Sequence, residues 1–122
     1  MKEYSFEKLD VWKESRVLTK MIYELSAQFP SKEMYGLTSQ IRRAAISVSL
    51  NIAEGSARPT VNDQAKSYKD AYGSLMEVLS ALIIAADIEY MDEKEINDTY
   101  RPIIAKISNQ LNALRNSILK NN

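Results

Sequence analysis

Apolar positions in Tyr35–Arg58 form the strongest pattern in the chain. Along one side of this stretch they recur at steps of three and four, as in a helix that faces a core: Leu37, Ile41, Ala44, Ala45, Val48 and Ile52. Ile46 and Leu50 lie on roughly the opposite side. A helix that is apolar on two sides is normally covered on both. We therefore expect its own bundle on one side and a fourth helix or another subunit on the other.

A polar stripe separates these two apolar sides, and it has three possible interpretations. It is a solvated helix face, a network that holds helices or subunits in register, or a site for a ligand or nucleic acid. Together with the outer apolar pair, the stripe predicts an oligomer interface made of Gln40, Arg43, Ile46, Ser47, Leu50, Asn51 and Glu54.

Three more segments have helical periodicity, and the four expected helices span about 8–28, 32–57, 61–89 and 92–120. Ser31 and Thr60 are the expected caps of the second and third helices. Pro102 predicts a kink or break near Asp98–Arg101, because proline lacks a backbone donor. The expected core seams of the first and third helices are Val11, Ser15, Leu18, Ile22, Leu25 and Phe29, and Tyr68, Tyr72, Leu75, Leu79, Leu82 and Ala86.

Four amphipathic segments with short connections predict an all-α fold, an antiparallel up-down-up-down four-helix bundle. Residues 1–122 fit a single domain of this kind. Seam steps that average three and a half residues predict left-handed packing at about 20°.

Composition excludes most kinds of catalytic and metal site. The chain has no His and no Cys, so the usual zinc ligands and the Ser–His and Cys–His pairs are missing. No phosphate loop or dinucleotide fingerprint is present. We expect no enzyme, no metal and no cofactor. The longest apolar run, around Ala81–Ala86, is too short for a bilayer, and the charged N-terminus has no signal-peptide core, so we expect a cytoplasmic protein without a membrane partner.

Charge limits how the protein can bind nucleic acid. Lys and Arg number 16, as do Asp and Glu, so the net charge is zero and binding needs a local basic patch. The candidate nucleic-acid contacts are Lys13, Arg16, Lys20, Arg42, Arg43 and Arg58. Asp10, Glu14 and Glu24 interleave with the first three of these, which favours a solvated face of mixed charge.

Three segments carry a resemblance to a known family: FEKLDVWKES at Phe6–Ser15, FPSKEMYGLTSQIRRAAISVSLNIAEGSAR at Phe29–Arg58 and YGSLMEVLSAL at Tyr72–Leu82. They resemble the four-helix-bundle proteins known as 23S rRNA intervening-sequence proteins, which carry a ribosomal-protein label. These are similar in turn to the accessory variability proteins of diversity-generating retroelements. The resemblance implies a cytoplasmic bacterial bundle that forms a ring-like homopentamer and is suspected of binding nucleic acid.

Here the residues that match the family motif are Gln40, Arg42, Arg43, Asn51, Glu54 and Gly55. Many relatives have Ser-Ile-Pro-Ser before the Asn, where this chain has Ser47-Val48-Ser49-Leu50. Nucleic-acid-binding relatives tend to be basic, whereas this chain is neutral.

Two hypotheses of function follow. The first is a non-enzymatic homo-oligomeric module that binds RNA, another nucleic acid or a nucleoprotein partner. The second is a protein–protein interaction scaffold with no nucleic-acid role. If the six basic residues converge on one rim of the assembled ring, the nucleic-acid-binding module is favoured. If they are scattered or paired with acids, the protein–protein scaffold is favoured.

Overall fold

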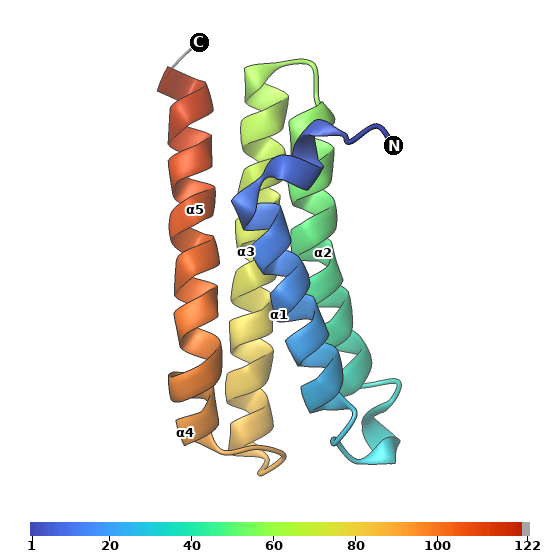
Figure 1. Ribbon diagram of the computed structural model, residues 1–122. Helices are drawn as coiled ribbons and strands as arrows, with labels where there is room; N and C mark the ends of the chain where they lie inside the picture. The colour runs from blue at the N-terminus through green and yellow to red at the C-terminus, as the bar shows by residue number, and fades with distance from the viewer. Residues whose placement is uncertain (121–122) are drawn as a thin grey trace.

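The computed structural model describes residues 1–120 and confirms an all-α, up-down-up-down four-helix bundle (Figure 1). The helices are α1 (Asp10–Ser26), α2 (Leu37–Ala57), α3 (Val61–Asp87), the short α4 (Glu93–Glu95) and α5 (Arg101–Lys120). Short 3-10 turns at Ser5–Lys8 and Ser31–Glu33 precede α1 and α2. A π-helical turn, Ile96–Tyr100, joins α4 to α5, so that these pieces form the fourth column of the bundle. The left-handed packing angle and the single domain over 1–122 stay predictions.

The core confirms the expected seams of α1 and α2. Every expected residue of the α1 seam, from Val11 to Phe29, is buried. The inner stripe of α2 is buried from Ile41 to Ile52, and Leu37 is half-buried at its start. Ser15 is a buried polar residue of the seam, and its hydroxyl group is satisfied by the carbonyl of Trp12 at 2.6 Å and by Ser49 on α2 at 2.7 Å.

The expected seam of α3 was wrong in part. Tyr72 is 38% exposed, and Leu79 and Ala86 are only half-buried. The core is instead lined by small and β-branched residues beside the expected leucines, among them Ala71, Val78 and Ala85. These small side chains turn a different side of α3 toward α2, the helix against which α3 packs most extensively. Close approach of two helix backbones requires small residues between them, and the larger Tyr72 is displaced outward.

The start of α2 also differs from the expectation. The helix begins at Leu37 instead of near residue 32, and Ser31 makes no capping bond. Glu33 does the capping, because its carboxylate accepts the backbone N–H of Leu37 at 3.2 Å. The hydroxyl of Tyr90, in the connection after α3, donates to the same carboxylate at 2.6 Å. These two hydrogen bonds lower the pKa of Glu33, so its ionised form ties together the two connections at this end of the bundle.

The remaining helix boundaries follow the sequence signals closely. The Thr60 hydroxyl accepts the N–H of Asp63 at 3.1 Å, which confirms the predicted cap of α3. The predicted irregularity before Pro102 is also confirmed, as the π-helical turn Ile96–Tyr100. There the N–H of Arg101 reaches back five residues to the carbonyl of Ile96. This wider turn accommodates the position where proline supplies no donor.

Candidate oligomer and nucleic-acid interface

The polar stripe of α2 faces α3, and its central residues are bonded inside the bundle. The hydroxyl groups of Ser47 and Ser74 lie 2.8 Å apart. Asn51 Nδ2 donates to the carbonyl and the hydroxyl of Ser47, at 2.9 and 3.0 Å. Both α2 residues are half-buried. Ser47 and Asn51 therefore have hydrogen-bond partners within one subunit, on the contact between α2 and α3.

The outer members of the stripe are exposed. Gln40 and Arg43 line a shallow groove of about 330 Å³ together with Ser74 and Glu77 of α3. Glu54 forms an ion pair with Arg58 one turn later on the same chain. That ion pair joins a residue of the expected oligomer interface to one of the candidate nucleic-acid contacts.

On its other side α2 is attached to α1 by small polar residues. The hydrogen bond between Ser15 and Ser49 is one link. The Thr19 hydroxyl group makes the other: it lies 3.2 Å from the carbonyl oxygen of Ala45 on α2 and 2.9 Å from that of Ser15 on its own helix. Short side chains at these positions hold the two helices close together. As a result, the longer residues beside them lie at the surface.

Those longer residues include the outer apolar pair of α2. Leu50 is 63% exposed and Ile46 is half-buried. Two shallow hollows meet at Ile46, one of about 320 Å³ that includes Leu50, Arg16 and Lys20, and one of about 260 Å³ that includes Tyr23 and Tyr35. We call this continuous surface the α1/α2 face, and its members are Arg16, Lys20, Tyr23, Met34, Tyr35, Arg42, Arg43, Ile46 and Leu50.

Sequence reasoning missed three apolar members of the α1/α2 face. Tyr23 and Met34 are exposed, and Tyr35, beside Gly36, is 98% exposed. The available signal was the pair Met34-Tyr35 next to a glycine, because large apolar residues in a connection have no helix to cover them. These residues extend the apolar strip of Ile46 and Leu50 toward the end of the bundle that holds the α1–α2 connection.

The six candidate nucleic-acid contacts have different surroundings. Arg42 is half-buried: its Nε donates to the buried Ser26 hydroxyl at 2.8 Å, and its guanidinium lies 4.5 Å from the centre of the Tyr23 ring. Arg58 is paired with Glu54. Arg16 lies 4.9 Å from the centre of the Trp12 ring. Lys13, Lys20 and Arg43 are exposed.

Within residues 1–120, Lys13, Arg16, Lys20 and Arg43 form no ion pair. Three of these unpaired groups, Arg16, Lys20 and Arg43, lie on the α1/α2 face, whereas Lys13 is exposed on α1 and lines neither hollow. The basic residues thus do not converge on one site: three unpaired cations lie on the α1/α2 face, Arg42 on that face is held by Ser26 and Tyr23, and Arg58 is paired with Glu54.

The description of the matching family model is "23S rRNA-intervening sequence protein", and the match covers residues 7–113. The chain belongs to this family. The matched region begins in the 3-10 turn before α1 and ends within α5, so it includes both helices of the α1/α2 face. No curated protein matches the sequence.

Two further findings concern the structure of this intervening-sequence protein. Over residues 1–120, no helix combines the length and the apolar character that a membrane span requires. In the same part of the chain, acidic residues do not gather in any group of three that could hold a metal ion.

Proposed function

We propose that this member of the 23S rRNA-intervening sequence family is a non-enzymatic module that assembles with copies of itself through the α1/α2 face. The carrying observation is the exposure of Leu50 and Tyr35 on one continuous surface. A contiguous apolar patch with basic residues is typical of a protein–protein contact, and Tyr, Met and Arg are enriched there. Full burial of an exposed Leu or Ile side chain is worth about 1.5–3 kcal/mol, so covering Leu50 and the remaining exposed part of Ile46 stabilises such a contact.

The intramolecular bonds refine the predicted interface. Ile46, Leu50 and Arg43 belong to the proposed contact, and Tyr23, Met34 and Tyr35 are added to it. Ser47 and Asn51 are assigned to the packing of α2 on α3, because Ser47 pairs with Ser74 and Asn51 donates to Ser47. A ring of five subunits in the cytoplasm of a bacterium is the arrangement that the family resemblance supports.

Sedimentation tests the proposed assembly. Wild-type protein at tens of micromolar should sediment as an oligomer, and Leu50→Asp should shift it to a monomer with an unchanged circular dichroism spectrum. Val17→Asp is the matched control, because Val17 is exposed on α1 but lies outside the α1/α2 face. A wild-type monomer under these conditions would falsify the proposal.

RNA binding is the second activity that we propose for the same face, in competition with self-assembly, and the cluster of Arg16, Lys20 and Arg43 together with the family description supports it. Lys13 adds a fourth unpaired cation. Each phosphate contact with single-stranded RNA contributes about 0.7 to the salt slope, so four contacts give a slope of about 3. The alternative is a scaffold that binds only protein.

Fluorescence anisotropy with a labelled single-stranded RNA distinguishes the RNA-binding module from the scaffold that binds only protein. We expect weak binding that falls with salt at a slope of about 3 or less. Charge removal by Lys13→Gln, at an exposed position outside the α1/α2 face, should weaken it further without changing assembly. Absence of binding at low salt would support the scaffold, and tight binding that survives high salt would contradict the phosphate-only mode.

A further inference from the structure

A second exposed apolar patch lies on the last two turns of α3. Ile83, Ile84 and Ile88 are each at least 40% exposed, and Ile84 is 48% exposed. They are separate from the α1/α2 face, which is built from the first two helices. Three isoleucines within six residues are an unusual concentration for a solvated helix end, because exposed patches of this kind generally mark contact sites.

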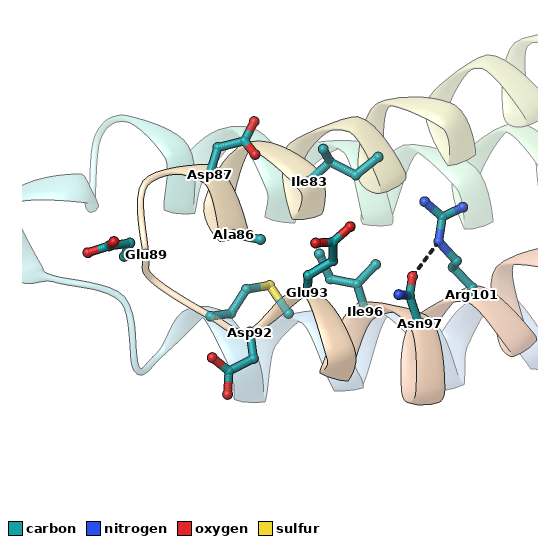
Figure 2. A pocket seen from close by; sticks show the side chains of 10 residues that line it. Ile83, Ala86, Asp87, Glu89, Asp92, Glu93, Ile96, Asn97 and Arg101 are labelled. Atoms are coloured by element: carbon teal, nitrogen blue, oxygen red, sulfur yellow. Dashed lines mark hydrogen bonds between the residues drawn. The ribbon is translucent and has the colours of Figure 1, made fainter.

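Acidic residues border this patch on the side of Ile83. Asp87, Glu89, Asp92 and Glu93 line, together with Ile83 and Ile96, a cleft of about 390 Å³ between α3 and the start of the fourth column (Figure 2). Arg101 is the basic residue of this cleft, and its Nε donates to Asn97 Oδ1 at 2.9 Å. Within residues 1–120 the four carboxylates form no ion pair. We call this surface, the three isoleucines with the four acids, the α3 end.

The two surfaces are complementary. The α1/α2 face joins apolar side chains to unpaired cations, Arg16, Lys20 and Arg43, and the α3 end joins apolar side chains to unpaired carboxylates. We propose that the α1/α2 face of one copy binds the α3 end of the next copy. This inference rests on the proposed self-assembly and names the surface that the α1/α2 face contacts.

A contact between two like surfaces is disfavoured by charge. Two α1/α2 faces pressed together would bring the unpaired cations of both copies into proximity, and two α3 ends would do the same with their carboxylates. Juxtaposed like charges oppose association, whereas opposite charges steer and orient it. Charge complementarity therefore favours the head-to-tail contact.

A head-to-tail contact repeats from copy to copy, and it produces a ring when the rotation closes and a filament when it does not. Met34 and Tyr35, in the α1–α2 connection, and Ile84 and Ile88, at the end of α3, lie toward the same end of the bundle (Figure 1). A contact through these two regions joins neighbours with little rise along the bundle axis, which favours a closed ring over a filament.

Mixing two variants that cannot assemble by themselves tests the inference. Leu50→Asp disables the α1/α2 face and keeps the α3 end, and Ile84→Asp does the reverse. Each variant alone should be monomeric, whereas an equimolar mixture should form a one-to-one heterodimer through the two intact surfaces. A mixture of Leu50→Asp with the double variant Leu50→Asp/Ile84→Asp is the control, and it should stay monomeric.

Charge reversal provides a second measurement at exposed positions that do not affect folding. Arg43→Glu and Asp87→Lys should each weaken assembly by about tenfold or more, and the double variant should recover part of that loss. Wild-type protein that is monomeric contradicts self-assembly itself. If the wild-type protein assembles and Ile84→Asp assembles equally well, the head-to-tail contact alone is overturned. The same conclusion follows if the mixture of Leu50→Asp and Ile84→Asp forms no heterodimer.

Discussion

Gly55 of α2 packs directly against the ring of Tyr68 in α3. A Cβ atom at Gly55 would lie 2.6 Å from Tyr68 Cε1 and 3.1 Å from Ser67 Cβ. Tyr68 is buried, so its ring has no free space into which to move. The glycine of the sequence Asn51-Ile52-Ala53-Glu54-Gly55 is therefore required by helix packing.

Gly55→Ala should destabilise the protein by about 1–3 kcal/mol, because overpacking outweighs the gain in helix propensity. Gly73→Ala is the matched control, since a Cβ there meets nothing within 4 Å. This second substitution, in the exposed middle of α3, should stabilise by about 0.5–1 kcal/mol. Urea unfolding measures both, and equal effects of the two substitutions would contradict the packing role.

Arg42 and Arg43 are neighbours with different roles, which predicts different effects on stability. Arg42→Ala removes the hydrogen bond to the buried Ser26 and the contact with Tyr23, and should cost about 1–2 kcal/mol. Arg43→Ala, at an exposed position, should change stability by less than about 0.5 kcal/mol. Both are measured by urea unfolding in the Leu50→Asp background, so that self-assembly does not contribute. Similar losses at both positions would show that Arg42 is not a structural anchor.

Glu89 has a left-handed backbone conformation, with φ of 67°, directly after α3. The N–H of Tyr90 bonds to the carbonyl of Ala85 at 2.8 Å and that of Glu89 to Ala86 at 3.0 Å, the pattern of a Schellman motif. Glycine adopts this conformation without strain, so Glu89→Gly should stabilise by about 1 kcal/mol in the same background. Glu89→Ala removes the charge but keeps the strain, and should not. A gain with alanine as large as with glycine would assign the effect to charge.

Burial raises the pKa of Tyr100 to about 12, with smaller contributions from the carboxylates of Glu95 and Glu24. Because the folded pKa exceeds that of the unfolded chain, near 10, the neutral hydroxyl contributes stability that is complete below pH 10. That contribution is lost as the pH rises from 10 toward 12. Tyr100→Phe should therefore reduce the loss of stability over this interval, as followed by urea unfolding. Tyr4→Phe, at an exposed position, is the control and should follow the wild type.

Much of the fold was predictable because burial repeats along each helix. The full seam of α1 and the inner stripe of α2 followed from steps of three and four, and the all-α bundle followed from those seams. Thr60 and Pro102 act through the backbone groups next to them, so the cap of α3 and the irregularity before α5 were also local properties. The exposed Leu50 was predictable for the same reason, because it lies opposite a regular apolar stripe.

Tertiary structure decided how each helix is rotated and which partners its polar residues find. Helical periodicity places Tyr72 and Ala71 almost equally well at a core position. The close approach of α2 to α3 leaves room only for the smaller residue, so Ala71 is buried and Tyr72 is exposed. Glu33 caps α2 and meets Tyr90, a residue far along the chain. Ser47 pairs with Ser74, and Arg42 is held by Ser26 and Tyr23. The sequence determined which faces are apolar, since helical periodicity is local, whereas hydrogen-bond partners depend on distances between helices that only packing establishes.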